Sequence, residues 1–166
     1  MSNILYELSF EFEPFLLIPL IMVVFIGFFP TLMKIYEKNN NEEKINHSFV
    51  KIFCICAAIH ALLFGIIGVG THLYGYNKLM NSYESGQYET VEGYVENFKP
   101  MPYEGHSDEY FEINGVEFSY SDFEITSGYH NAKSHGGVIK ENGQHLKIGY
   151  VHNVKGNIIV YIEQLS

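Results

Sequence analysis

The sequence contains no arginine. Its ten basic residues are all lysines, against nineteen acidic residues, and the formal net charge is −9. Phosphate binding needs basic clusters and the bidentate contacts of arginine, so this composition argues against nucleic acid as a partner. Cysteine is also scarce: Cys54 and Cys56 are the only two, and a helix would point them in different directions. The sequence therefore predicts no disulfide framework.

Charged residues are missing from two long stretches, residues 15–33 and 52–70. Each matches the roughly 20 apolar residues that cross a bilayer as a helix. Glutamates and no lysines precede the first stretch, the reverse of a secretory signal peptide. The sequence thus predicts two transmembrane helices joined as a hairpin, with Pro30 kinking the first, and the lipid bilayer as a partner.

The second stretch carries a face of small side chains at helical spacing, made by Cys54, Ala57, Ala61, Gly65 and Gly68. Membrane helices pack closely through such faces, either against the first helix or against a second copy in a homo-oligomer. His60 lies beside this face, and a polar residue inside a span is by default a functional hypothesis. Neither span holds a second ionisable residue, which favours a structural hydrogen bond from His60 across the helix interface.

Lysines predict the orientation of the hairpin. The loop 34–51 holds Lys34, Lys38, Lys44 and Lys51, whereas the N-terminal flank holds none. The positive-inside rule places such a loop in the cytoplasm and the C-terminal part outside the membrane. Tyr74 and Tyr76 suit an interfacial helix extension or turn after the second span. The predicted domains are residues 1–84, the hairpin with this extension, and residues 85–166, a soluble β-domain.

Alternating apolar residues predict the strands of the β-domain. Two alternating runs between residues 109 and 120 flank Asn114-Gly115, the preferred centre of a type I′ hairpin. Further strands are predicted at 88–98, 144–151 and 157–162. Five short strands suggest a small all-β domain, an OB-like or related five-stranded barrel. Glu104, Asp108 and Glu109 are expected in one solvated acidic loop, with weak calcium binding as the alternative.

Three runs of the C-terminal half carry a resemblance: residues 118–129, 134–139 and 146–150. They are similar to stretches of uncharacterised small bacterial membrane proteins with two N-terminal transmembrane helices and a C-terminal β-rich domain. The resemblance implies this architecture. We expect the protein in a bacterial inner (cytoplasmic) membrane. The resemblance implies no activity, cofactor or catalytic residue.

The segment 121–137 has no strand pattern, and long loops on small domains often carry function. Its candidate functional residues are Ser127, Tyr129, His130, Lys133, Ser134 and His135. Histidine spacings match no zinc signature, and the segment has no nucleophile-elbow motif. No catalytic residue, metal ligand or cofactor is therefore assigned, and the alternative is a loop that closes one end of the barrel with Tyr129.

Three functions follow from these features. The favoured one is a non-enzymatic envelope protein that presents its β-domain for protein binding or scaffolding. The second is a membrane immunity or regulatory protein that acts through its helical hairpin. The third is a metal-binding or hydrolytic protein that uses the 121–137 loop.

Overall fold

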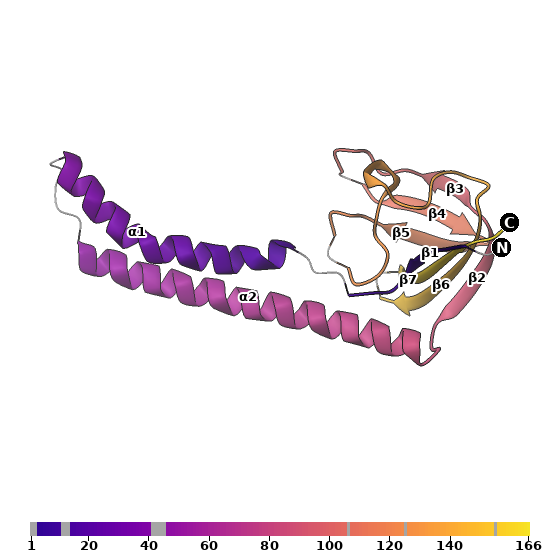
Figure 1. Ribbon diagram of the computed structural model, residues 1–166, viewed down its shortest axis with the longest axis horizontal. Coiled ribbons are helices and arrows are strands. Elements are labelled where there is room, and N and C mark those ends of the chain that lie inside the picture. The colour runs from indigo at the N-terminus through magenta and orange to yellow at the C-terminus, as the bar shows by residue number, and fades with distance from the viewer. Residues whose placement is uncertain (1–2, 11–13, 41–45, 106, 125, 155) are drawn as a thin grey trace. The chain divides into compact units, whose positions relative to one another are not determined.

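The computed structural model describes residues 3–10, 14–40, 46–105, 107–124, 126–154 and 156–166. The chain divides into two compact units (Figure 1). One unit, called here the helical hairpin, is Phe12–Thr71. The other, called here the β-domain, combines Met1–Glu11 with His72–Ser166.

The helical hairpin is built from a 3-10 helix η1 (Pro14–Leu17), helix α1 (Ile18–Asn40) and the first part of helix α2 (His47–Glu84). The Asn46 side chain starts α2, because its oxygen accepts hydrogen bonds from the N–H groups of Ser48 at 3.1 Å and Phe49 at 3.2 Å. Pro30 lies inside α1, whose ribbon is bent (Figure 1).

Both helices are long and apolar enough to cross a membrane, and almost none of their apolar side chains are buried within the chain. The two predicted spans, 15–33 and 52–70, thus coincide with helical segments. α2 does not end with the apolar stretch. It continues to Glu84, as the alternative of a helix extension predicts.

The β-domain has seven strands in two antiparallel sheets. Sheet A has the order β1-β7-β6-β2, and its strands are β1 (Asn3–Glu7), β7 (Gly156–Gln164), β6 (His145–Asn153) and β2 (Glu89–Tyr94). Sheet B has the order β3-β4-β5, and its strands are β3 (Glu96–Lys99), β4 (Glu109–Ile113) and β5 (Val116–Tyr120). The small all-β domain is confirmed, but the count of five strands is wrong. Among the described strands no ladder joins the two sheets into a barrel.

The main core lies between the two sheets and contains the buried side chains of Phe111, Phe118, Ile148, Ile159 and Ile162, with others. The predicted β-hairpin is present: β4 and β5 pair around Asn114 and Gly115, with φ of 48° and 79°. Both values lie in the left-handed region that a type I′ turn requires.

The predicted strand 88–98 is instead two strands in different sheets. Val95 separates them, and its side chain is buried in the main core. Its N–H donates to the Gln144 carbonyl at 2.9 Å, and its carbonyl accepts from the N–H of Gly143 at 2.8 Å. These two hydrogen bonds hold Val95 against the residues just before β6, and the chain passes from sheet A to sheet B at this position.

Strand β1 was not predicted, and it changes the domain boundary. It pairs antiparallel with β7, and the N–H of Leu8 donates to the Val160 carbonyl at 2.9 Å. Leu8 and Val160 form a second, smaller core with Leu79 of α2. The first residues and the last turns of α2 therefore belong with the β-domain. The predicted division at 84/85 is based on hydropathy, which does not reveal a strand partner that is distant in sequence.

Candidate functional site

The middle of the 121–137 loop packs against the main core between the two sheets. Tyr129 is buried in the main core, its N–H donates to the Ile159 carbonyl at 2.9 Å, and its hydroxyl accepts from the N–H of Val138 at 2.6 Å. Burial, the largest cause, raises the pKa of Tyr129 to about 12. The sequence allows two interpretations of Tyr129, a functional residue or a residue that closes one end of the domain. This geometry matches the second.

Two glycines show how tightly the loop lies on the rest of the domain. A Cβ added at Gly128 would lie 2.7 Å from the carbonyl oxygen of Ile159, and one added at Gly137 would lie 2.0 Å from the carbonyl oxygen of Asn131. Both obstacles are backbone atoms, which cannot move aside as a flexible side chain would. Only a residue without a side chain allows these close approaches.

A buried carboxylate, Glu109, holds the second half of the loop. It is fully buried. Its oxygens accept hydrogen bonds from the N–H of Lys133 at 3.2 and 3.0 Å, the Tyr120 hydroxyl at 2.8 Å and the N–H of Met101 at 3.4 Å. This set of donors offsets the cost of burying a carboxylate. Glu109 thereby fixes the short 3-10 helix η2 (Lys133–His135) against β4.

Sequence reasoning missed this role, because Glu109 was expected in a solvated acidic loop with Glu104 and Asp108. That expectation is wrong: Glu109 points into the core, and Asp108 accepts a hydrogen bond from the Ser119 hydroxyl at 2.9 Å. The available signal was strand phase, since Glu109 shares the inward face of β4 with Phe111 and Ile113.

An aspartate and a histidine meet at the surface of the loop. Nδ1 of His135 lies 2.5 Å from a carboxylate oxygen of Asp122, and the Ser134 hydroxyl lies 3.5 Å from the same nitrogen. A hydrolytic triad needs the serine on one ring nitrogen and the acid on the other. Because both groups contact Nδ1, Ser134, His135 and Asp122 cannot act as such a relay. The Asp122–His135 pair joins two parts of the loop instead.

The aromatic rings of Tyr103 and Phe123 flank His135 on the outside of the domain. Their ring centroids lie 4.7 and 6.0 Å from that of His135. Both rings are largely exposed, at 69% for Tyr103 and 66% for Phe123. The Asp122–His135 pair thus carries a small aromatic surface that faces outward.

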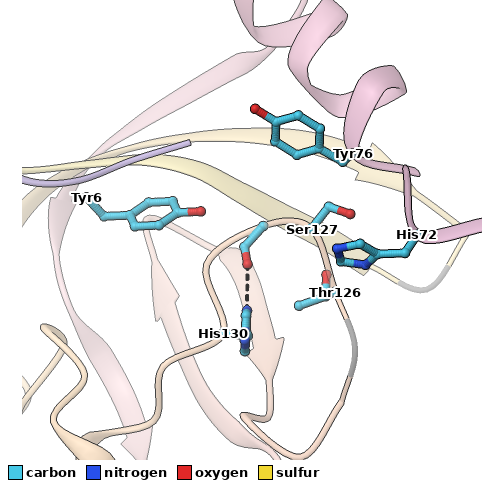
Figure 2. A pocket seen from close by; sticks show the side chains of 7 residues that line it. Tyr6, His72, Tyr76, Thr126, Ser127 and His130 are labelled. Atoms are coloured by element: carbon cyan, nitrogen blue, oxygen red, sulfur yellow. Dashed lines mark hydrogen bonds between the residues drawn. The ribbon is translucent and has the colours of Figure 1, made fainter. Parts of the chain in front are cut away.

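Ser127 and His130 line a small pocket at the other side of the loop, with Tyr6 of β1 and with His72 and Tyr76 of α2 (Figure 2). Nδ1 of His130 lies 2.8 Å from the Gly128 carbonyl. The pocket has a cavity volume of about 10 Å³, room for one water molecule. Ligand pockets hold roughly 300–1,000 Å³, so this one is too small for a substrate.

The six candidate residues of the loop therefore divide among separate places. Ser127 and His130 line the small pocket, and Tyr129 lies in the core. Lys133 bonds to Glu109 through its backbone and carries its ammonium 5.6 Å from the centre of the Phe98 ring. Ser134 and His135 lie at the surface with Asp122. Among the described residues, no three His, Cys, Asp or Glu side chains come together as metal ligands.

In the helical hairpin, Nδ1 of His60 lies 3.1 Å from the carbonyl of Cys56, one turn earlier on the same helix. The expected bond across the helix interface is thus replaced by a local one. The small-residue face of α2 is its least exposed side, and Cys54 is buried. A Cβ added at Gly65 would lie 3.1 Å from Cβ of Pro19, so the first helix of the same chain covers part of this face.

An acidic row crosses the outer face of sheet B. The ladder places Glu96 opposite Glu112, and Glu112 opposite Glu117. The Tyr110 hydroxyl donates to Glu112, which is the main reason that the pKa of Glu112 is lowered and that of Tyr110 is raised to about 12. Like charges directly opposite one another repel, and here hydrogen bonds from Tyr110 and Asn97 and the charge of Lys99 offset that repulsion at Glu112.

Sheet A offers a direct contrast. There the equivalent row alternates in charge, with Glu92 opposite Lys147 and Lys147 opposite Glu163. The helical hairpin, residues 12–71, contains four lysines and four glutamates and is formally neutral. The whole formal charge of −9 therefore belongs to the β-domain, and sheet B concentrates part of it.

Comparisons of the chain with protein-family models, with curated proteins and with solved structures find no match. The protein is therefore described by its own structural features alone. Two helices that are long and apolar enough to cross a membrane accompany an antiparallel β-domain of seven strands in two sheets.

Proposed function

We propose that this chain is a non-enzymatic envelope protein, anchored in a bacterial inner membrane by α1 and α2, that presents its β-domain to a protein partner. Strand pairing supports the anchor. β1 precedes both helices and β7 follows them, yet the two strands are hydrogen-bonded neighbours. Both ends of the helical hairpin must then lie on one side of a membrane, which two crossings achieve and one crossing does not.

The lysines of the loop 34–51 support an orientation with this loop in the cytoplasm and the β-domain outside. Cysteine labelling tests it in a Cys54→Ala, Cys56→Ala background. We expect an impermeant maleimide added to intact spheroplasts to label a Tyr94→Cys chain. A Lys38→Cys chain should react only after the membrane is opened. The reverse pattern would overturn the orientation.

The acidic row of sheet B is the observation that carries the protein-binding proposal. The row gathers three carboxylates on one face of sheet B, and hydrogen bonds from Tyr110 and Asn97 favour the charged form of Glu112 there. Glu96 and Glu117 are exposed, and Glu112 is half-buried beneath the Tyr110 hydroxyl. The chemistry that complements this face is a protein surface rich in lysine and arginine.

Charge reversal tests the face directly. Full-length protein is isolated from membranes in mild detergent, and the proteins that co-purify with it are compared between variants. Glu112→Lys with Glu117→Lys should remove a specific partner that wild-type protein retains at low salt. The matched control, Glu92→Lys with Glu163→Lys, reverses two charges of sheet A and should leave that partner bound. Equal retention by both variants, or no partner and no self-association, would contradict the proposal.

An exchange of anchors separates this function from action through the helical hairpin. Residues 14–71 are replaced by an unrelated two-span hairpin. Retained partner binding supports presentation by the β-domain, whereas loss of binding in a folded chimera places the activity in the hairpin.

A further inference from the structure

We propose that the loop end of the β-domain contacts the lipid bilayer itself, with Phe123 in the interfacial layer. The loop end is defined here as residues 8–10, 72–76, 101–105, 121–124 and 126–128. The inference rests on the proposed membrane anchor, and it adds a second contact with the membrane that is made by the β-domain.

Both chain connections to the helical hairpin leave the β-domain at this end, side by side. The ring of Phe10, after β1, lies 5.1 Å from the ring of Tyr76 and 6.3 Å from that of His72, measured between centroids. His72 follows the apolar stretch 52–70 by two residues, about 3 Å along a helix axis. The interfacial layer on each side of the hydrocarbon core is roughly 5–7 Å thick, so this exit lies within it.

The 121–128 segment is held against the same turn of α2. A Cβ added at Gly75 would lie 3.6 Å from the Ser127 hydroxyl oxygen, and Thr126 and Ser127 line the small pocket with His72 (Figure 2). Phe123 is three residues before Thr126, which limits their separation to about 11 Å. Phe123 therefore lies at the same end of the β-domain as the turn of α2 that contains His72 and Gly75.

The aromatic surface at this end is ordered before any contact is made. A Cβ added at Gly105 would lie 2.9 Å from the Phe123 ring, and His135 packs between Phe123 and Tyr103 while Asp122 binds its Nδ1. Tyrosine is enriched at the interfacial layer because its ring is apolar and its hydroxyl is polar, and phenylalanine is among the side chains that peripheral proteins bury at the headgroup–acyl boundary. The acidic side chains around the rings, Glu104, Asp122 and Glu124, favour zwitterionic over anionic lipid headgroups.

The chain has no tryptophan, so a single introduced tryptophan reports one position. Three full-length variants are reconstituted in phosphatidylcholine vesicles, with and without bromine atoms on the acyl chains. Phe64→Trp marks α2 inside the apolar stretch, where the native ring is exposed. Phe123→Trp marks the loop end. Tyr94→Trp is the matched control, because Tyr94 lies at the other end of sheet A. The adjacent Gly93 belongs to a row of paired residues that continues through Leu146 and Gln164 to Asn3, the first residue of β1. The chain leaves β1 for the helical hairpin from the opposite end of that strand.

Bromine should quench Phe64→Trp strongly, lower the emission of Phe123→Trp roughly twofold, and leave Tyr94→Trp unchanged. Quenching of Phe64→Trp without quenching of Phe123→Trp would overturn the lipid contact and leave the anchor intact. If the indole of the Phe123→Trp variant were shielded from acrylamide but not quenched by brominated lipid, the surface would be assigned to a second copy of the chain, and the lipid contact would also be overturned. Absence of quenching in Phe64→Trp would instead remove the proposed anchor.

Discussion

The side chain of Glu109 and the backbone of Lys133 connect β4 to η2: both carboxylate oxygens accept from one N–H group, at 3.2 and 3.0 Å. A residue at the first position of a strand thus fixes the conformation of a loop 24 positions away in sequence. The loop is ordered by the core beneath it.

Removal of this carboxylate should destabilise the β-domain. Glu109→Ala leaves the buried Tyr120 hydroxyl without its acceptor, at about 1–3 kcal/mol, and also removes the acceptor of the part-buried N–H of Lys133. We expect the free energy of unfolding to fall by about 3 kcal/mol, measured by urea unfolding of the full-length protein in detergent with tyrosine fluorescence. Glu109→Gln keeps one acceptor oxygen and should fall between. Glu96→Ala, an exposed control in the acidic row, should have no effect or a small stabilising one.

Gly137 should tolerate no side chain. Gly137→Ala would place Cβ 2.0 Å from the carbonyl oxygen of Asn131, which forces the backbone of the loop to move. A loss of at least about 2 kcal/mol in unfolding free energy is expected, measured in the same way. Gly75→Ala is the matched control: its Cβ makes an ordinary contact at 3.6 Å, and alanine favours a helix by up to about 1 kcal/mol. Equal stability of the two variants would show that the loop is not closely packed.

Stability should fall at high pH because of the buried tyrosines. The pKa of Tyr129 rises from its ordinary value of 10.0 to about 12 in the folded protein. The folded state therefore favours the neutral phenol, and this contribution is complete below pH 10 and lost as pH rises through 12. Two pKa units correspond to about 3 kcal/mol. The decline between pH 10 and pH 12 should be shallower in Tyr129→Phe than in wild type.

His60 should be dispensable for anchoring. Its ring bonds to the Cys56 carbonyl of its own helix, so His60→Leu removes no contact between helices. We expect the variant to insert into vesicles as wild type does and to unfold at the same urea concentration. Loss of the co-purified partner by a His60→Leu protein that still inserts would reveal a function for this residue inside the membrane.

The features that the sequence predicts correctly are encoded locally. The apolar runs determine the two long helices, and Asn114-Gly115 determines a β-hairpin because its residues tolerate positive φ. The features that it misses depend on distant partners. β1 is a short strand whose pairing partner is β7, at the opposite end of the chain. No local pattern distinguishes it from a linker.

Candidate site residues show the same difference. The composition of the 121–137 segment indicates serine, histidine and aspartate chemistry, but composition does not say which atoms meet. Ser134 and Asp122 converge on one nitrogen of His135, which removes the relay that the residue types allow. The row of Glu96, Glu112 and Glu117 depends on strand register, which a sequence determines only after its strands are paired.

The pairing of β1 with β7 has a consequence for the order of events during synthesis. β1 is made before both long helices and β7 after them. β1 therefore stays without this partner until β7 has been made, so sheet A is completed only after both helices have been synthesised. A chain stopped before β7 would keep both helices and lose the partner of β1, which exposes an unpaired edge to other nascent chains.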